Sequence, residues 1–310
     1  MKKISVLGDS NVDIIITLNK SSKLSEPKLF FGGTSANVAA GLSKLGNNIS
    51  FFGSVGNDIY GQDIIKNMST NSINTENLEI IDNSNTAMVI GIVSKNGERD
   101  LYVWPPKCAA HSKYVITDNH IAHLENSDWL HVSGISLREE PVKSSMLAAM
   151  KICKKNKVKI SFDLNLRTEL WGLTEEFKTT VFQAIKYSDF IFGNLHDEIN
   201  KLFNKDNLLQ QLGNFAEHDQ VFITRDGANG STTYINDKVI ASKGLEVIPI
   251  DTVGAGDAFN VGFIHSMINE NNLEKALLNA NTVAAYTLEG ESSRHQPNSE
   301  ELENFTNRFR

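Results

Sequence analysis

The chain has few of the features that mark secreted, metal-binding or membrane proteins. Its 310 residues include two cysteines, Cys108 and Cys153, so a disulfide framework and CxxC metal sites are excluded and both are interpreted as ordinary thiols. His120 and His123 lack further ligands nearby and are interpreted as solvated. No apolar run reaches the roughly 18 residues that a membrane span needs. The first residues, MKKISVLGDS, lack a small-residue cleavage site and are interpreted as a first strand, so we expect a cytoplasmic protein.

Positive charge is also scarce. The chain has 30 Lys and Arg against 37 Asp and Glu, a formal net charge of −7 with neutral histidines. This balance argues against a nucleic-acid partner and against a basic membrane-surface protein. The 40% hydrophobic and 22% charged residues are typical of a soluble globular protein whose core needs no covalent staples.

Common nucleotide-binding signatures are missing as well. The sequence has no GxxxxGK[ST] loop and neither the HRD nor the DFG triplet of protein kinases. The segment GAGDAF has Phe259 where the dinucleotide fingerprint GxGxxG needs its third glycine. A dehydrogenase is therefore not expected.

From residue 115 onward, strand-like and helix-like segments alternate. Apolar runs at DWLHVS, VKISFD, DFIFG and QVFIT are separated by helical patterns such as 141–156 and 174–187. This alternation predicts a parallel sheet with helices on both faces. Ligands of such sheets bind beyond the carboxyl ends of the strands. The polar residues that follow the predicted strands are Gly8-Asp9, Asp163, Asn194 and Thr224.

The first 105 residues are organised differently. Strand-like runs at 13–18 and 29–31 predict a hairpin, and the pattern becomes helical at 34–46. Two more runs, TAMVIGIV and RDLYVW, flank an Asn-Gly pair, which is a strong hairpin signal. We therefore predict two β insertions, at about 12–31 and 86–105, emerging from one parent domain.

The most informative segment is DTVGAGDAFNVG, residues 251–262. It follows a β-like stretch at 245–250 and precedes a helical pattern at 258–268, so its small residues stand at a strand-to-helix turn. Backbone amides at a helix N-terminus form an anion site. Asp257 beside that site could accept a proton from a hydroxyl that attacks a phosphoryl group. The alternative is a tight turn in which Asp257 only caps the helix.

The segment DTVGAGDAF resembles the C-terminal signature of the PfkB (ribokinase-like) carbohydrate kinase family, and GGTSANVAAGLSKLG, residues 32–46, resembles its N-terminal signature. The two lie in the expected order, and the resemblance covers essentially the whole chain. It implies an α/β, ribokinase-like fold: one domain over residues 1–310, with a central, mostly parallel sheet, helices on both faces and a small β-sheet lid. The lid would close over the sugar, and pairing of lids between subunits would make a homodimer.

The resemblance also implies a reaction, the Mg²⁺-dependent transfer of the γ-phosphoryl group of ATP to a hydroxyl of a sugar or nucleoside. Asp257 would be the general base, and the amides of Gly254, Ala255 and Gly256 would form the anion hole. The implied sugar-binding residues are Asn11, Asp13, Gly32, Gly33 and Asn37. Without the resemblance, a simple turn at the glycine pair and an exposed helix residue at Asn37 would be favoured.

The nucleotide side follows from the same resemblance. ITRDGANGS, residues 223–231, resembles the family's glycine-containing loop near ATP, with either Thr224 or Arg225 in its leading position. The alternative is a capped surface turn and an ordinary helix asparagine at position 281. The implied ATP-binding residues are Asn194, Thr224, Arg225, Gly227, Gly230 and Asn281.

Two cation sites are implied too. GNLHDE resembles the family's Asn-x-x-Glu element, here with Asp197 or Glu198 as the carboxylate that acts on Mg²⁺ through water. Asp251 and the Val253 carbonyl, with Gly290 on an opposing loop, resemble a monovalent-cation site for K⁺.

The substrate is less sharply indicated. DLNLRTELW, residues 163–171, is similar to a stretch of fructokinases and 2-keto-3-deoxygluconate kinases in which Arg167 would contact substrate or phosphate; the alternative is a surface arginine over Trp171. Pro105 and Pro106 stand where acid-sugar kinases often carry an arginine, which weakens the case for a carboxylated sugar. We therefore expect a neutral ketohexose first, a ribose-like pentose second, and a nucleoside or pseudouridine third. A non-catalytic sugar-binding regulator is the remaining alternative.

Overall fold

A computed structural model describes residues 2–18, 24–93, 99–203, 208, 211–212, 219–236 and 238–309. The strands are β1 Lys3–Leu7, β2 Asn11–Thr17, β3 Lys28–Gly32, β4 Asn48–Gly56, β5 Ile73–Ile81, β6 Ala87–Val93, β7 Arg99–Trp104, β8 Trp129–Ser133, β9 Lys159–Asp163, β10 Phe190–Asn194, β11 Val221–Arg225, β12 Ser231–Ile235 and β13 Lys238–Ser242. The α-helices are α1 Thr34–Lys44, α2 Ile59–Thr70, α3 Asp118–Glu125, α4 Val142–Lys155, α5 Thr168–Trp171, α6 Glu175–Tyr187, α7 Asn200–Leu202, α9 Ala255–Glu270, α10 Leu273–Leu288 and α11 Ser299–Asn307.

Nine of the strands form one sheet in the order β13-β12-β11-β10-β9-β8-β1-β4-β5. Pairing is parallel from β11 to β5 and antiparallel at the β11–β12 and β12–β13 edge. Each of the four predicted strand runs after residue 115 is one of these strands, β8 to β11. The predicted α/β class with a mostly parallel central sheet is confirmed.

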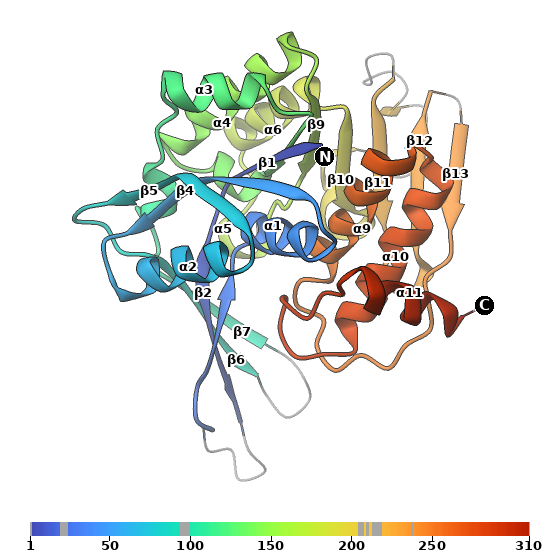
Figure 1. Ribbon diagram of the computed structural model, residues 1–310, viewed down its shortest axis with the longest axis horizontal. Helices are drawn as coiled ribbons and strands as arrows, with labels where there is room; N and C mark the ends of the chain where they lie inside the picture. Colours follow the sequence, from blue (N-terminus) through green and yellow to red (C-terminus); the bar gives the residue numbers. More distant parts are fainter. Residues whose placement is uncertain are drawn as a thin grey trace.

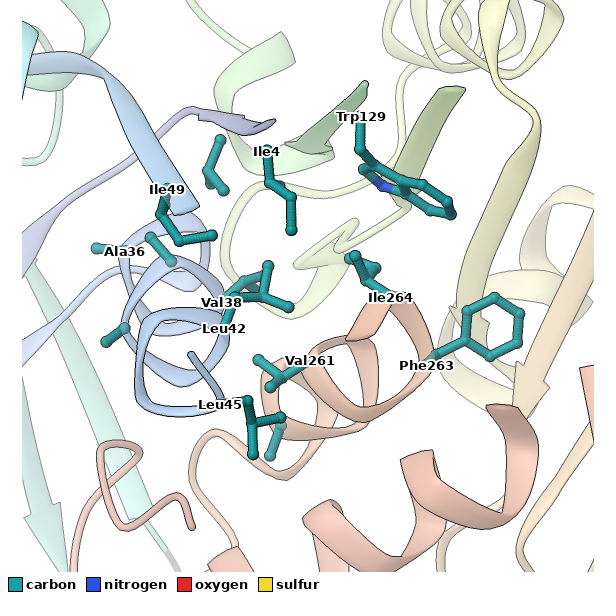
Figure 2. Close-up of a cluster of buried hydrophobic side chains, with 14 of the residues drawn as sticks. Ile4, Ala36, Val38, Leu42, Leu45, Ile49, Trp129, Val261, Phe263 and Ile264 are labelled. Carbon is teal, nitrogen blue, oxygen red and sulfur yellow. The ribbon is translucent and has the colours of Figure 1, made fainter. Parts of the chain in front are cut away.

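Helices cover both faces of this sheet, because successive side chains of a strand point to opposite faces. In β10, Phe190 and Phe192 pack into one cluster with Phe263 of α9, at ring distances of 5.7 and 5.1 Å, while Ile191 packs into a second cluster. The first cluster lies under α1, α2, α9 and α10, and the second under α3, α4 and α6. Figure 2 shows Val38 of α1 beside α9 in the first cluster.

The remaining four strands form a separate sheet in the order β3-β2-β6-β7. Strand β2 pairs antiparallel with β3 and parallel with β6, which in turn pairs antiparallel with β7. The two predicted β insertions therefore come together as one small sheet, which projects from the main body in Figure 1. The Asn-Gly pair at 96–97 lies outside the described residues.

Two expectations about local structure were wrong. Residues 245–250 form no strand; Ile248 and Ile250 are 86% and 65% exposed, and the segment includes Pro249, which has no N–H to donate to a sheet. His120 is not solvated. It is 7% exposed and stacks on Tyr114, whose hydroxyl lies 2.9 Å from Nδ1, while the half-buried His123 packs against a phenylalanine of β4.

Within the described part of the chain, no helix has the length and apolar character needed to cross a membrane.

Candidate active site

Polar residues collect where parallel strands of the large sheet end. Asp9 follows β1, and Asp163, Asn194 and Arg225 are the last residues of the adjacent strands β9, β10 and β11. The Asp9 carboxylate accepts hydrogen bonds from the amide and the hydroxyl of Thr34, both at 2.8 Å. Asp9 thereby holds the start of α1 against the end of β1. These residues lie at the sheet edge where the sequence predicts ligand contacts.

The N-terminus of α9 carries the predicted anion site. Gly254 precedes the helix with a φ of +79°, and a Cβ on it would lie 2.4 Å from the Cβ of Ser293, so both backbone conformation and space favour glycine. Ala255 and Gly256 begin the helix, whose first amides have no acceptor within it. The Ala255 amide also approaches the Thr252 carbonyl at 3.5 Å. Amides of the first turn and the positive end of the helix dipole are suited to an anion.

Asp257 is the third residue of α9 and is buried. Its Oδ2 accepts a hydrogen bond from Nδ2 of Asn37 at 2.8 Å. Asn37 lies on α1 and is 4% exposed, so it is not a solvated helix residue. Burial raises the pKa of Asp257 to about 7; the Asn37 hydrogen bond opposes this rise and the charge of Asp163 adds to it. A carboxylate that titrates near neutral pH is suited to accept a proton.

Four of the predicted sugar-binding residues meet at the end of the small sheet where β2 begins and β3 ends. Asn11 is paired with Gly32 in the β2–β3 register and donates from Nδ2 to Oδ1 of Asp13 at 2.6 Å. A Cβ on Gly32 would lie 2.3 Å from Oδ2 of Asp13, so the glycine makes room for this carboxylate. Gly33 has a φ of +96°, and a Cβ there would lie 2.6 Å from the Cα of Ser10. Burial raises the pKa of Asp13 to about 6 against the effect of the Asn11 hydrogen bond.

Arg167 lies between β9 and α5 with a left-handed φ of +45° and a half-exposed side chain. Its positive charge lowers the pKa values of both Asp13 and Asp257, so Arg167 lies at the same end of the sheet as these two carboxylates. The guanidinium over the Trp171 ring is instead that of Arg138, 5.2 Å from the ring centroid. The structure thus brings Arg167 near the predicted sugar residues.

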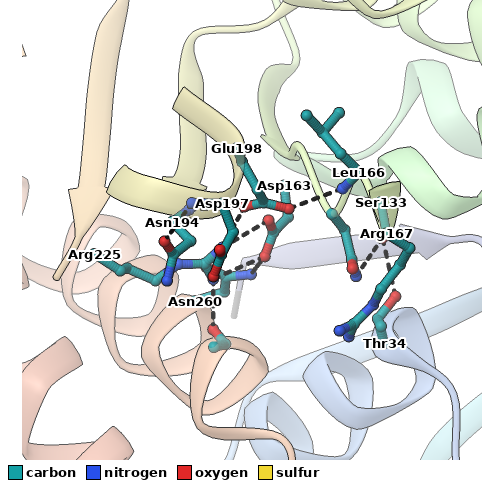
Figure 3. Close-up of polar contacts among 12 residues, drawn as sticks. Thr34, Ser133, Asp163, Leu166, Arg167, Asn194, Asp197, Glu198, Arg225 and Asn260 are labelled. Carbon is teal, nitrogen blue, oxygen red and sulfur yellow. Dashed lines mark hydrogen bonds and ion pairs between the residues drawn. The ribbon is translucent and has the colours of Figure 1, made fainter. Parts of the chain in front are cut away.

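Behind the anion site, Arg225 forms a buried network of charges (Figure 3). Its Nη1 and Nη2 donate to the two carboxylate oxygens of Asp163 at 2.9 and 2.8 Å. Nη1 also donates to the Gly256 carbonyl at 3.0 Å, and Nη2 lies 3.6 Å from the Glu198 carboxylate. Burial disfavours the charge of Asp163, but Arg225, together with Asn260, which donates at 2.6 Å, holds its pKa below the ordinary value. The network ties the start of α9 to the ends of β9 and β11.

The two carboxylates left open by the sequence lie on one turn but in different surroundings. Leu195–Ile199 form a π-helical turn, and Oδ1 of Asn194 accepts from its amides, including that of Asp197 at 2.9 Å. Glu198 is 8% exposed and accepts from the amides of Asn194 and Leu166 at 2.7 and 2.8 Å. Burial raises the pKa of Glu198. Asp197 is exposed. Glu198 is therefore the inward carboxylate and Asp197 the solvent-facing one.

The glycine-containing loop lies next to the end of β13 and to α10. Gly227 begins the turn after β11, and a Cβ on Gly230 would lie 2.2 Å from the Ser242 carbonyl. Asn281 of α10 donates to the Ser242 carbonyl and hydroxyl at 3.2 and 3.1 Å. Thr224 is buried, and its hydroxyl donates to a carbonyl of β12 at 3.3 Å. The structure thus gathers the loop glycines with Asn281, whereas the Thr224 and Arg225 side chains are engaged inside the protein.

The predicted monovalent-cation residues lie on two adjoining loops. Oδ1 of Asp251 accepts from the Val253 amide at 2.9 Å, and Oδ2 accepts from the Ser292 amide at 3.4 Å. Gly290 packs on the His295 ring, where a Cβ would lie 2.0 Å from the nearest ring atom. The Asp251 carboxylate thus links the two loops beside the N-terminus of α9.

Two residues of the site were not predicted from the sequence. Arg294 donates from Nε to Oδ1 of Asn37 at 2.8 Å, and burial lowers its pKa to about 10 despite the opposing charges of nearby carboxylates. Asn260 contacts Asp163, as described above. Helical spacing could have identified Asn260, which lies three residues after Asp257 on α9. The sequence signal for Arg294 is weaker: it lies in the same loop as Gly290, which was predicted for the cation site.

Comparison with known proteins places the chain. Residues 1–301 match the model of the pfkB family of carbohydrate kinases. The chain belongs to the PfkB family. Within this family, similarity extends over most of the chain. It is 31% identical over 297 residues to a protein named "Probable fructokinase-7" of Arabidopsis thaliana, covering 91% of this chain and 85% of that protein.

Other PfkB relatives carry two different names. A fructokinase of Vibrio alginolyticus is 32% identical over 265 residues, 85% of this chain and 83% of that protein. A 5-dehydro-2-deoxygluconokinase of Mesomycoplasma hyopneumoniae is 26% identical over 288 residues, 90% of this chain and 84% of that protein. The chain is thus a carbohydrate kinase, a phosphotransferase that acts on a sugar hydroxyl.

Solved structures of fructokinases have the same fold. A fructokinase double mutant from Vibrio cholerae O395, in a form with bound fructose, ADP and potassium ion, has a TM-score of 0.83, 25% identity and coverage of 98% of both chains. A fructokinase with bound ATP from Xylella fastidiosa has a TM-score of 0.86 with coverage of 99% of this chain and 98% of that chain; at 18% identity it supports the ribokinase-like fold alone.

Proposed function

We propose that this kinase transfers the γ-phosphoryl group of ATP to a hydroxyl of a neutral ketohexose. The observation that carries the proposal is the buried Asp257 carboxylate, hydrogen-bonded by Asn37 at 2.8 Å, at the N-terminus of α9. The relatives named fructokinase favour a ketohexose, and one fructokinase of similar structure holds fructose and ADP.

The proposed chemistry follows from the start of α9. Asp257 takes the proton of the attacking sugar hydroxyl as general base, which typically accelerates a reaction by about 10²–10⁴-fold. The amides of Gly254, Ala255 and Gly256 donate to the charge that develops on the transferred phosphoryl group, and loss of one such donor typically costs about 3 kcal/mol. Arg225 holds the Gly256 carbonyl from behind at 3.0 Å, so the peptide between Gly256 and Asp257 keeps its orientation.

The sugar is proposed to bind between β2, the start of α1 and the Arg167 loop. Polyols need converging donors and acceptors, and close backbone approach is easiest at glycine. Asp13, whose burial raises its pKa to about 6, accepts from sugar hydroxyls in its ionised form. The proposed sugar-binding residues are Asn11, Asp13, Gly32, Gly33, Asn37 and Arg167.

ATP is proposed to lie over the glycine-containing loop and α10. Gly227 and Gly230 let the phosphates and ribose approach the backbone, and Asn281 lies beside the end of β13, where adenine would bind. Thr224 and Arg225 support this loop from inside the sheet. The residues proposed to contact ATP are Asn194, Gly227, Gly230 and Asn281, whereas Thr224 and Arg225 act from beneath them.

Mg²⁺ would enter with the nucleotide. Among the residues described by the structure, no group of three His, Cys, Asp or Glu side chains is arranged to hold a metal ion. Mg²⁺ usually keeps several waters and binds through one or two carboxylates and the substrate phosphates. Exposed Asp197 and, more deeply, Glu198 would hold its waters. When bound, the ion neutralises phosphate charge; the protein residues position it.

K⁺ is proposed to bind at Asp251, the Val253 carbonyl and the Gly290 loop. Both loops adjoin the start of α9, so a bound cation there would stabilise the anion site electrostatically. One fructokinase of similar structure is described with a potassium ion.

A carboxylated sugar, which the sequence disfavoured, takes the place of the ribose-like pentose as the second candidate. The relative named 5-dehydro-2-deoxygluconokinase and the position of Arg167 beside the proposed sugar residues favour it. A nucleoside or pseudouridine would use the same base, and a non-catalytic regulator would bind sugar without turnover.

The small sheet is proposed to act as a lid over the sugar. It is also proposed to pair with the same sheet of a second copy in a homodimer. The protein is proposed to act in the cytoplasm. The small sheet exposes large apolar side chains, including Leu29, Leu101, Tyr102 and Trp104 at 41–56%. Exposed sheet surfaces of this kind need a cover. Sedimentation at micromolar concentration should give a dimer; a strict monomer would remove this part of the proposal.

The substrate assignment is tested by ADP release with ATP, Mg²⁺ and K⁺ over a panel of sugars. Turnover is expected to be fastest with fructose. A higher kcat/KM with 2-keto-3-deoxygluconate or 5-dehydro-2-deoxygluconate would establish the second candidate. Turnover restricted to nucleosides would favour a nucleoside kinase, and binding without ADP release would favour the regulator.

A further inference from the structure

Arg294 reaches the proposed base through one intermediate side chain. It lies on the loop between α10 and α11 and donates from Nε to Oδ1 of Asn37 at 2.8 Å. Ser293, its neighbour, donates from its hydroxyl to the same oxygen at 3.2 Å. On its other side, the Asn37 carboxamide donates from Nδ2 to Oδ2 of Asp257 at 2.8 Å. A loop far along the chain from the base is thus connected to it by two consecutive hydrogen bonds.

The chemistry of this chain of contacts allows one orientation. A guanidinium donates hydrogen bonds and accepts none, whereas a carboxamide has a donating end and an accepting end. Arg294 therefore requires the oxygen of Asn37 to face it, and the NH2 group must then face Asp257. An Asn37 turned by 180° would put its oxygen against a carboxylate and its NH2 against a guanidinium.

We propose that Arg294 is a positioning residue: by fixing the Asn37 carboxamide, it occupies Oδ2 of Asp257 and leaves Oδ1 to accept the proton of the sugar hydroxyl. The proposal rests on the proposed function, in which Asp257 is the general base. Asn37 then hydrogen-bonds the base, and only its remaining hydrogen-bonding capacity is left for the sugar.

The charge of Arg294 supports the same arrangement. Its pKa is raised by Asp13 and Asp257, although burial lowers it overall to about 10, so the guanidinium stays charged at neutral pH. Because the interaction is mutual, Arg294 favours the ionised form of Asp257. The charged groups that act on Asp257 from the surrounding elements are Asp9, Asp163, Arg167, Arg225 and Arg294.

The loop itself is anchored independently of Asn37. Nζ of Lys44, at the end of α1, donates to the carbonyls of Arg294 and Gln296 at 2.8 and 3.0 Å. The Gln296 side chain is 2% exposed and donates to the Ser293 carbonyl at 3.1 Å. Lys44 thus offers a matched control, a cation that holds the same loop without contacting the carboxamide.

The test compares Arg294→Met, Arg294→Lys and Lys44→Met in the pH dependence of kcat/KM, with ATP and the best sugar of the panel. The acidic limb is the low-pH part of the profile, in which kcat/KM rises as the base ionises. In Arg294→Met this limb is expected to move to higher pH by about one unit, because the ionised base loses a nearby cation. Its kcat should fall by about 10–100-fold, since the base oxygen is no longer held in place. Arg294→Lys keeps a positively charged donor, so it should retain most of the wild-type kcat and most of the wild-type position of the limb. Lys44→Met should lower thermal stability without moving the limb.

A double-mutant cycle with Asn37→Leu separates positioning from charge. Asn37→Leu removes the carboxamide and keeps Arg294, so it should lower kcat and also move the limb to higher pH, because the Asn37 hydrogen bond is the main contact that opposes the rise in the pKa of Asp257. Because both residues act on the base through one amide, the kcat losses of Arg294→Met and Asn37→Leu should not add. If the fold-losses of the two single variants multiply in the double variant, the positioning role is refuted.

The outcomes distinguish this inference from the function on which it rests. If Asp257→Asn turns over as fast as the wild type, the proposed function fails. If Asp257→Asn is inactive but the limb of Arg294→Met stays in place, or moves equally in Lys44→Met, the function stands and the role of Arg294 is refuted.

A readout without turnover is the difference in unfolding free energy between wild type and Asp257→Asn as a function of pH. Since the folded-state pKa of Asp257 is raised to about 7, wild type should lose stability relative to the variant as pH rises from the ordinary carboxylate range through 7. In an Arg294→Met background, the pH range over which this loss of stability occurs should extend to higher pH. An unchanged pH range would contradict the proposal.

Discussion

Both terminal nitrogens of Arg225 donate to Asp163, one to each carboxylate oxygen, at 2.9 and 2.8 Å, and this pair is buried beneath the N-terminus of α9. The side chains are 14% and 4% exposed. Removing one partner of a buried pair leaves an uncompensated charge, here that of Asp163 with Glu198 nearby. The Gly256 carbonyl would also lose its donor.

We therefore expect Arg225→Met to lower the free energy of unfolding by about 3–5 kcal/mol. Turnover should fall as well, because the anion site is held by the same guanidinium. Urea denaturation measures the first effect and ADP release the second. Arg308→Met is the matched control: Arg308 also makes a two-pronged pair, with Glu289 at 2.7 and 3.0 Å, but at the exposed surface, and its loss should change stability little. Equal effects of the two substitutions would contradict the role given to Arg225.

Gly254→Ala tests the start of α9. The residue has a φ of +79°, and the added Cβ would lie 2.4 Å from the Cβ of Ser293. Gly46→Ala provides the control, since Gly46 has a φ of +80° but no atom within 4 Å of the added Cβ. Both substitutions should cost about 1 kcal/mol of backbone strain, measured by thermal unfolding, and Gly254→Ala should cost more because Ser293 must also move. Only Gly254→Ala should also lose kcat, because it displaces the anion site; equal activities would refute that reading of the turn.

The large sheet was predictable because its strands are apolar and short and alternate with amphipathic helices. The strands β8 to β11 and the helices α4 and α6 match the predicted runs closely. Residues 245–250 look equally β-like in sequence but form no strand, since apolar composition alone does not show whether a paired neighbour exists. His120 was misjudged for a related reason: besides the nearby Tyr114, its burial depends on β4, which is distant in the sequence.

The site was predictable where it is local and less so where it depends on distant contacts. The turn before α9, the segment after β1 and the glycine pair before α1 are each compact sequence motifs. The inward orientation of Glu198 depends on a π-helical turn that adds one residue to the spacing from Asn194. The contact of Arg294 with Asn37 joins residues 257 positions apart, so only the folded chain reveals it.

The pH dependence of turnover follows from Asp257. Burial raises its pKa to about 7, and the base must be ionised to accept a proton, so kcat/KM should rise with pH and reach half its maximum near pH 7 in the free enzyme. Steady-state rates over a pH series with fructose would measure this. In Asp13→Asn the same limb should remain while the KM for the sugar increases. A rate independent of pH through this range would contradict the assignment.

Activation by K⁺ is expected from Asp251 and the loop of Gly290. Rates in potassium buffer should exceed those in tetramethylammonium buffer, and Asp251→Ala should abolish the difference, because its carboxylate supplies the charge for the cation. Equal rates of the wild type in the two buffers would remove the cation site.

The most direct test of the central claim is ADP release by Asp257→Asn, with ATP, Mg²⁺ and K⁺ and the best sugar of the panel. Asparagine keeps the size of the side chain but removes its basicity, so kcat should fall by about 10²–10⁴-fold while nucleotide binding, measured by thermal shift, stays close to that of the wild type. Turnover that survives this substitution would show that Asp257 is not the base.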